Sequence, residues 1–218
     1  KIKWWSPTGI FVAEDEKLTK RRKEEAQKKN PEANGVTEPL RDPSVPWDEA
    51  QLLIPGTSIR GALRSRASRI ARTVLAAEAE NKLTPFTSHD VHEQIAAEPN
   101  LVRYMFGCTE YRGAITVHDC RSKKRGTRVE VTHNVIDRWT GGVIDGGLFT
   151  EAVYLGTHWE PITIDIDLRQ LLNNIEAEKG PEDREQSNPT HADYAHAAYV
   201  LLGLVLAELS AGTLPLGS

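Results

Sequence analysis

Apolar residues recur at helical spacing in three stretches of the chain. From Ile59 they follow at steps of four, four, three and four residues, which predicts a helix with one buried face. The same periodicity predicts a shorter helix over Leu168–Glu178 and a long helix over Thr190–Ser210, which Gly212 ends. The positions expected to be buried are Ile59, Leu63, Ala67, Ile70 and Val74 in the first helix, and Tyr194, Ala198, Leu201, Leu202, Val205 and Leu209 in the last.

Other stretches have the composition and the alternation of strands. Ile2–Val12 is rich in aromatic and β-branched residues, and both Gly113–Asp119 and Glu160–Asp167 alternate between apolar and polar residues. A further short helix is expected over Ser88–Ala97. The order of elements is therefore strand, helix, strands, helix, which predicts an α/β (α+β) fold with a ferredoxin-like or RRM-like core.

We expect one domain over residues 1–218, with two additions to its core. Residues 13–50 form an insertion, since most of it is charged or interrupted by prolines and offers no apolar stripe to bury. Residues 132–151 are expected to form a long hairpin, because glycines interrupt a segment that also carries β-branched and aromatic residues. The sequence ends where the final strand of the core would begin, so we expect a truncated C-terminal end or an edge completed by another chain.

Composition and charge narrow the class of protein. With 39% hydrophobic and 27% charged residues, the chain is typical of soluble globular proteins and lacks an apolar run long enough to cross a membrane. Two cysteines provide no disulfide framework, and no signal peptide opens the chain, so we expect a cytoplasmic location and no membrane partner. The net charge of −4 argues against a uniformly basic nucleic-acid-binding surface.

The distribution of charge is more informative than its sum. Five arginines and no acid lie between Gln51 and Ala77, and a second basic cluster spans Arg121–Arg128. Acids gather later, between Glu151 and Glu185. This segregation predicts a protein that binds a polyanion selectively through a positive face.

The stretch Ile54–Arg64 combines several features of a phosphate-binding site. A helix N-terminus presents unpaired N–H groups with a positive partial charge, and Ser58 is a candidate N-cap. The alternative is a well-capped helix with exposed arginines, and the stretch is not a Walker loop because Gly-Lys-Ser/Thr is absent. The residues expected to contact phosphates are Gly56, Thr57, Ser58, Arg60 and Arg64.

The second candidate is the expected hairpin. Ile136, Trp139 and Val143 are the side chains that would wedge against or stack on bases. The alternative is a structural excursion that packs on its own sheet.

These stretches resemble, in order, those of RAMP-superfamily proteins, the repeat-associated subunits of type III CRISPR effector complexes. Ile54–Arg64 resembles the motif that opens the family's first helix. The other similar stretches are Met105–Gly107 with Gly113–Asp119 (the Leu-Phe-Gly turn and next strand), Asn134–Gly141 with Leu148–Gly156 (the thumb hairpin and following strand), and Leu214–Ser218 (the start of the C-terminal Gly-rich loop).

The resemblance implies an RNA-binding backbone subunit or domain in antiviral defence. Its partners would be CRISPR guide RNA, target RNA, and other effector subunits or fused domains. The thumb would intrude between guide and target, and sequence would be read by base pairing. The RNA-binding residues it implies are Gly56, Thr57, Ser58, Arg60, Arg64, Asn134, Ile136, Arg138, Trp139 and Thr140. The alternative is a stand-alone RNA-binding ferredoxin-like domain.

Guide-directed RNA cleavage is a further alternative. In RAMP-superfamily proteins that cleave RNA, an aspartate before the Pro-Gly motif supports metal-dependent cleavage, whereas this sequence has Thr37 or Glu38 in the corresponding region. The displaced candidates are Asp42, then Asp48 and Asp15. With Mg²⁺, one of them would position the attacking ribose hydroxyl. Against this, Asp42 is typical of a turn residue before a proline.

A zinc site is possible by composition but is not favoured. The candidate ligands are Cys108, His118, Cys120 and His133, with His89 and His92 nearby. Because no C-x₂-C pair is present, we expect a buried thiol and surface imidazoles, and no metal ligand is assigned.

Overall fold

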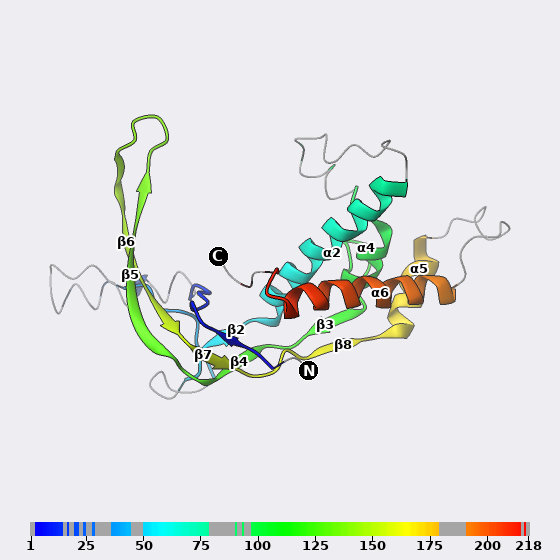
Figure 1. The fold of residues 1–218 in the computed structure, drawn as a ribbon, viewed down its shortest axis with the longest axis horizontal. Helices are drawn as coiled ribbons and strands as arrows, with labels where there is room; N and C mark the ends of the chain where they lie inside the picture. The colour runs from blue at the N-terminus through cyan, green and yellow to red at the C-terminus, as the bar shows by residue number, and fades with distance from the viewer. Residues whose placement is uncertain are drawn as a thin grey trace. The chain divides into compact units, whose positions relative to one another are not determined.

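A computed structural model shows two compact units (Figure 1). The first contains Lys1–Pro55, Asp119–Ile162 and Leu216–Ser218, and the second contains Gly56–His118 and Thr163–Pro215. The structure describes residues 3–14, 36–44, 50–78, 97–178, 191–214 and 216, together with positions 17, 20, 21, 24, 28, 90 and 93.

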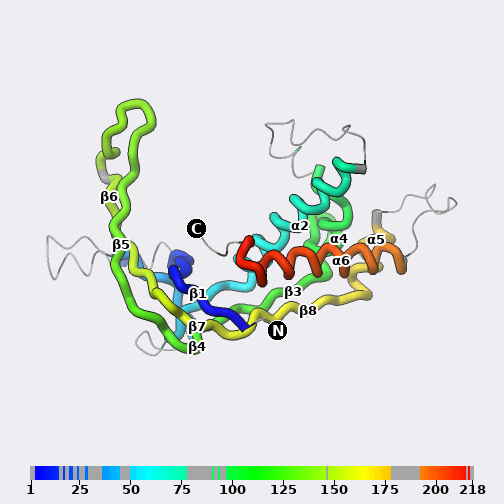
Figure 2. The backbone as a smooth tube through the Cα atoms, in the orientation of Figure 1, coloured from blue at the N-terminus to red at the C-terminus, as the bar shows by residue number. Residues whose placement is uncertain are grey.

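The first unit contains a four-stranded antiparallel sheet. Its order is β1 (Trp5–Ser6), β7 (Thr157–Trp159), β4 (Cys120–Lys124) and β2 (Leu53–Ile54), with β1, β7 and β4 side by side in Figure 2. The expected N-terminal strand is therefore present but short, while β7 and β4 were not predicted. One face of the sheet is buried, and its side chains are Ser6, Cys120, Ser122, Thr157 and Trp159.

Two tryptophans pack together at the buried face of this sheet. Trp4 stacks on Trp159, with ring centroids 5.5 Å apart. Trp159 Nε1 donates a hydrogen bond to Ser6 Oγ at 3.0 Å, so the indole N–H is satisfied in the interior. The aromatic character of the N-terminal stretch thus supplies core packing as well as strand propensity.

A hairpin is present where one was expected, and its strands extend beyond residues 132–151 at both ends. It consists of β5 (Thr127–Ile136) and β6 (Val143–Leu155), which pair in antiparallel register from Thr127↔Leu155 to Ile136↔Val143. At its base, a Cβ on Gly126 would lie 1.8 Å from the Leu155 carbonyl oxygen, so only glycine fits there. The strands continue beyond 132–151 because the flanking residues include further β-branched side chains.

A short segment within the expected insertion pairs with the base of this hairpin. Thr37 N donates to Thr150 O at 2.8 Å, and Ala152 N donates to Thr37 O at 2.9 Å. Arg41, which is 9% exposed, donates to the Tyr154 hydroxyl at 2.9 Å. Residues 36–44 are therefore structured, although the sequence predicted an irregular stretch.

The second unit contains a two-stranded antiparallel sheet of β3 (Ile115–Val117) and β8 (Ile164–Ile166). Its helices are α2 (Gly56–Glu78), α4 (Asn100–Phe106), α5 (Leu168–Glu178) and α6 (His191–Ser210). Its core includes Ile59, Leu63, Ala67, Val102, Phe106, Leu171, Ile175, Ala198, Leu201, Leu202 and Val205.

Sequence periodicity correctly predicted most helices of this unit. The helices over α2, α5 and α6 are confirmed, whereas α4 was not predicted and most of the helix expected at 88–97 lies outside the described residues. With antiparallel sheets and four helices among the described residues, the chain has the predicted α+β character, consistent with a ferredoxin-like fold.

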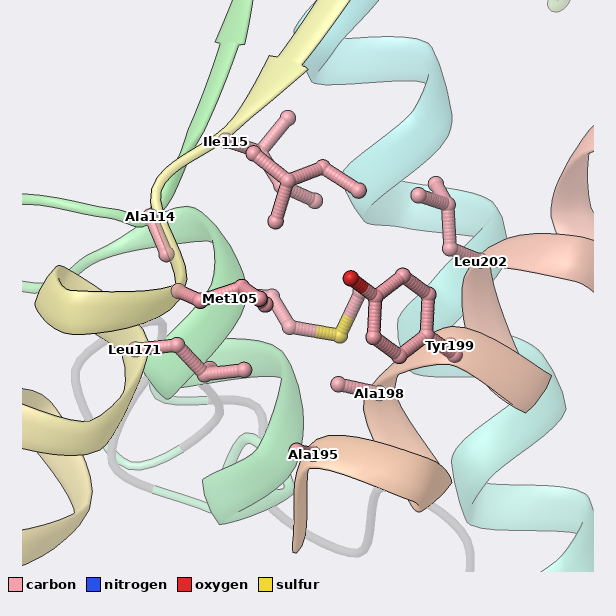
Figure 3. A pocket seen from close by; sticks show the side chains of 10 residues that line it. Met105, Ala114, Ile115, Leu171, Ala195, Ala198, Tyr199 and Leu202 are labelled. Carbon is pink, nitrogen blue, oxygen red and sulfur yellow. The ribbon is translucent and has the colours of Figure 1, made fainter. Parts of the chain in front are cut away.

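An apolar hollow in the second unit lies among α4, β3, β8, α5 and α6 (Figure 3). Its lining residues are Met105, Ala114, Ile115, Ile166, Leu168, Leu171, Ala195, Ala198, Tyr199 and Leu202. Its lining is apolar except for the hydroxyl of Tyr199.

The α6 helix is apolar enough to resemble a membrane span by length and composition. Its stretch Ala192–Ser210 has a mean hydropathy of 1.3. Ala198, Leu202 and Val205 are nevertheless buried in the second unit. These residues belong to the 22% of the stretch that is buried, and a single helix of this kind is weak evidence for a membrane span.

Candidate nucleic-acid interface

The first turn of α2 is positioned by a glycine that nothing else could replace. A Cβ on Gly56 would lie 2.0 Å from the Val117 carbonyl oxygen, because the helix begins directly against the end of β3. Thr57 and Ser58 are exposed in this first turn. Ser58 is therefore not the N-cap expected from the sequence, since the helix starts two residues earlier.

This turn can bind phosphate oxygens. The first N–H groups of a helix have no intrahelical partner, and the dipole of a 23-residue helix adds positive potential there. The exposed hydroxyls of Thr57 and Ser58 supply further donors beside those N–H groups. The arrangement suits contacts with a nucleic-acid backbone.

Arg60, one turn further along α2, is half-buried and lacks a carboxylate partner among the described residues. One terminal nitrogen, Nη2, donates to the Phe106 carbonyl oxygen, while its Nε is buried without a hydrogen-bond partner. Burial, followed by the neighbouring Arg64 charge, lowers the pKa of Arg60. An anion beside this guanidinium would therefore stabilise its charged form.

Arg64 makes an ion pair within the protein. Its guanidinium donates to both carboxylate oxygens of Glu98, with distances of 3.0 and 2.5 Å. Ser68 Oγ also donates to Glu98, at 2.8 Å. Although burial opposes it, these hydrogen bonds keep the pKa of Glu98 below its ordinary value. Arg64 is thus placed to hold the fold, and its contact with phosphate stays a prediction.

The expected positive face of α2 is partly neutralised in space. Besides the Arg64–Glu98 pair, Arg66 makes an ion pair with Glu208 of α6. Both acids come from distant parts of the sequence, so an acid-free stretch of chain does not produce an acid-free surface.

The tip of the β5–β6 hairpin is held by Asp137. One carboxylate oxygen accepts hydrogen bonds from the backbone N–H groups of Trp139 at 2.7 Å and Thr140 at 2.8 Å. These bonds, the one from Thr140 first, lower the pKa of Asp137. Gly141 follows at φ +69°, which favours glycine. The turn therefore presents Trp139 to solvent, with 97% of the residue exposed.

Apolar side chains continue below the tip. Ile136 and Val143 are paired across the strands and are 56% and 57% exposed. Exposed apolar surface of this kind marks interaction sites, and it excludes the alternative that the hairpin packs on its own sheet. The hairpin brings together all the RNA-binding residues predicted on it, and each of them is exposed. They are Asn134, Ile136, Arg138, Trp139 and Thr140.

Leu148 and Phe149 were missed as candidates for base contact. They are 58% and 38% exposed and lie opposite Asn134 and His133 in the hairpin. The signal for them was two consecutive apolar residues in a strand already expected to project from the body.

Nearby acids also partly neutralise the second basic cluster, Arg121–Arg128. Arg121 Nε donates to Asp42 at 2.5 Å, and Arg128 pairs with Glu38 at 2.7 Å. Lys123 and Lys124 are exposed and make no ion pair with the residues that the structure describes.

Asp42, the first candidate for catalysis, has a carboxylate that accepts hydrogen bonds on both of its oxygens. Oδ1 accepts from Ser44 N at 3.0 Å and Ser44 Oγ at 2.6 Å, while Oδ2 accepts from Arg121. The Ser44 hydroxyl first, then Arg121, hold the pKa of Asp42 well below its usual range. Oδ1 thus accepts two hydrogen bonds and Oδ2 accepts one, so a Mg²⁺ ion would have to compete with Ser44 and Arg121 for this carboxylate. Asp48 and Asp15 lie outside the described residues.

The cysteines and histidines considered as zinc ligands each contact a different neighbouring group. Cys120 is buried, its thiol donates to Glu160 O at 3.1 Å, and burial raises its pKa to about 11. His118 lies 2.6 Å from Asp165, and His133 stacks on Phe149. Cys108 lies in the loop after α4, within 3.9 Å of Arg103 Nη2. Over the described ranges, no group of three or more His, Cys, Asp or Glu residues is arranged to hold a metal.

Comparison with known proteins assigns a family to this arrangement. The family model of the RAMP superfamily matches residues 52–187, which run from the start of β2 past the end of α5. A search of curated proteins found no match. RAMP proteins generally bind RNA and partner subunits, and membership points to a CRISPR-associated RNA-binding role. Because the match covers more than half of the sequence, the chain belongs to the RAMP superfamily.

Proposed function

We propose that this chain binds CRISPR guide RNA as a backbone subunit or domain of a type III effector complex that captures complementary target RNA in antiviral defence. The observation that carries the proposal is the β5–β6 hairpin, whose tip exposes Trp139 almost completely above the Ile136–Val143 pair. A water-exposed apolar wedge on a long hairpin has no role in the core of this chain. It suits insertion between stacked bases.

In this proposal, the α2 N-terminus grips the guide without reading its sequence. The N–H groups and hydroxyls of Thr57 and Ser58 would bind phosphate oxygens, with Arg60 beside them. Contacts of this kind position an RNA backbone, and the bases remain free to pair with a target.

Affinity purification of the protein from its native host, followed by sequencing of bound RNA, tests the proposal. We expect short RNAs that share a repeat-derived tag. Recovery of no RNA, or of an unselected mixture, would contradict guide binding and favour the stand-alone RNA-binding domain.

Arg60 and Arg64 should differ in their contribution to guide binding. Arg60→Ala is expected to lower the slope of log affinity against log salt by about one, because one phosphate contact is lost. Arg64→Ala serves as the matched variant one turn away, and it should reduce thermal stability with little change in slope because Glu98 already neutralises its charge. Salt titrations of guide RNA binding measure both slopes. Equal slopes for wild type and Arg60→Ala would exclude Arg60 from the phosphate site.

Asp42 is expected to stabilise the first unit. Its pKa lies below the ordinary value of 3.8 when folded, so its contribution is present above about pH 4 and is lost as pH falls through the folded value. Asp42→Asn should therefore lower the Tm at pH 7, and the gap from wild type should narrow below pH 4. Thermal melts from pH 7 to pH 3 measure the gap, with Asp145→Asn on the exposed hairpin as control. A gap independent of pH would contradict this role.

Guide-directed cleavage of target RNA is the alternative function, and three aspartate variants test it. The separate variants Asp42→Ala, Asp48→Ala and Asp15→Ala distinguish a scaffold from a nuclease. Unchanged cleavage of target RNA by all three would establish the scaffold. Loss with one variant, at unchanged guide content, would identify a catalytic aspartate.

A further inference from the structure

The outward face of the four-stranded sheet carries an exposed aromatic pair. Trp5 of β1 is 56% exposed and lies opposite His158 of β7 in the antiparallel register. The two rings stack with centroids 6.2 Å apart and an interplanar angle of 22°. The opposite face of the same strands holds the buried residues Ser6, Thr157 and Trp159, so the Trp5–His158 pair is not part of the core.

A β-bulge places two lysines beside this pair. Ser122 of β4 pairs with Trp159, but the register then shifts and Lys124 pairs with His158. Lys123 is the extra residue of the bulge, and both lysines are exposed. Bulges commonly re-aim side chains in this way.

The shift produces a continuous row across three neighbouring strands. Trp5, His158 and Lys124 lie opposite one another in register on β1, β7 and β4, which are adjacent in Figure 2. Neither Lys123 nor Lys124 has an ion-pair partner within the described part of the chain, unlike Arg121 and Arg128 in the same cluster. The row thus combines a flat aromatic surface with uncompensated positive charge.

We propose that this row is a binding platform for single-stranded RNA, separate from the α2 turn and the β5–β6 hairpin. A base stacks on Trp5 and His158, and the adjoining phosphates contact Lys123 and Lys124. Stacking on aromatic side chains combined with lysine–phosphate contacts is how proteins hold single strands without reading sequence. The proposal rests on the proposed function in so far as the chain must bind RNA, but it names a different surface.

Uncompensated lysines favour RNA over a protein partner. A protein surface that docked here would have to bring carboxylates to two adjacent lysines and an apolar group to the indole. An RNA strand supplies both chemistries in every nucleotide, as a phosphate and a base.

Binding of a fluorescein-labelled twelve-nucleotide oligouridine to the purified protein, followed by anisotropy, tests the platform. Trp5→Ala should weaken binding about fivefold or more, whereas Trp5→Phe should stay within about twofold of wild type because it keeps a stacking ring. Lys124→Ala should lower the salt slope by about one, and the control Arg169→Ala on α5 should leave it unchanged.

The outcomes separate this platform from the proposed function. If wild-type protein binds no oligouridine, the platform is overturned, while the proposed function is decided by the RNA that co-purifies from the native host. If Trp5→Ala binds as tightly as wild type while Trp139→Ala is weakened, the platform is overturned and the proposed function stands. Unchanged RNA binding by Trp5→Ala, together with loss of a protein that co-purifies with wild type, would assign the surface to a protein partner and overturn the platform.

Crosslinking keeps the proposal testable if Trp5→Ala fails to fold, which circular dichroism would reveal. Wild-type protein purified with its natural RNA is irradiated after incorporation of 4-thiouridine, and crosslinked peptides are identified by mass spectrometry. Crosslinks at Trp5 or His158 support the platform. Crosslinks confined to residues 56–60 and 134–143 overturn it.

Discussion

Gly56→Ala is expected to destabilise the protein by about 3 kcal/mol, because the new methyl group meets backbone that has nowhere to move. Its carbon would lie 2.0 Å from the Val117 carbonyl oxygen and 2.8 Å from the carbonyl carbon of the same residue. Relief requires the start of α2 to separate from the end of β3. At the size of this chain, the loss corresponds to a fall in Tm of about 6–12 °C.

The same helix offers a matched control substitution, for which the expected change in stability has the opposite sign. Gly61 lies within α2, and a Cβ there would meet no atom within 4 Å. Gly61→Ala should therefore raise stability by about 1 kcal/mol through helix propensity alone. Thermal and urea unfolding of the two variants measures the contrast. A Gly56→Ala protein as stable as wild type would show that α2 does not begin against β3.

The double variant Trp139→Ala with Ile136→Ala is expected to weaken capture of target RNA about tenfold or more, because a stacked base contributes on the order of 1–3 kcal/mol. Guide RNA content should stay unchanged, since the guide is held by its backbone in the proposed function. Thr127→Ala, at the base of the same hairpin, should leave target capture unaffected. The measurement is target affinity of the guide-loaded complex. Wild-type affinity in the double variant would exclude the tip from the guide–target duplex.

Local sequence pattern was sufficient for elements that are long and bury one face. The helix predicted over Leu168–Glu178 corresponds to α5, and the described part of the helix predicted over Thr190–Ser210 is α6, His191–Ser210. The α2 stripe was correct as far as Ala67, whereas Val74 is 50% exposed because the last turns of the helix extend beyond the core. Periodicity identifies the apolar side of a helix but not where the neighbouring elements stop.

Short elements escaped prediction for a different reason. The seven residues of α4 make about two turns, too few for a helical repeat to stand out from chance. The three residues of β7 owe their place to pairing with β1 and β4, which lie far away in the sequence. Tertiary pairing, which no local window contains, decides such segments.

The candidate site was predicted better in its apolar part than in its charged part. The hairpin residues are exposed together because a hairpin is a local structure, and the glycines within 132–151 were enough to predict it. The arginines of α2 were harder to judge, since Glu98 and Glu208 reach Arg64 and Arg66 only after folding. Asp42 is a similar case: its partner Ser44 lies two residues away in the sequence, whereas its partner Arg121 reaches it only after folding.

Both units are assembled from separated stretches of chain, and this has a consequence for synthesis on the ribosome. The β1–β7 pairing joins Trp5 to His158, so β1 must wait until about 150 further residues have been translated before it finds its partner. The β5–β6 hairpin, by contrast, closes between neighbouring segments and can form as soon as Leu155 emerges. Because non-local pairing is slow, we expect the hairpin to precede the four-stranded sheet in folding, and the segment around Trp5 to depend most on chaperones.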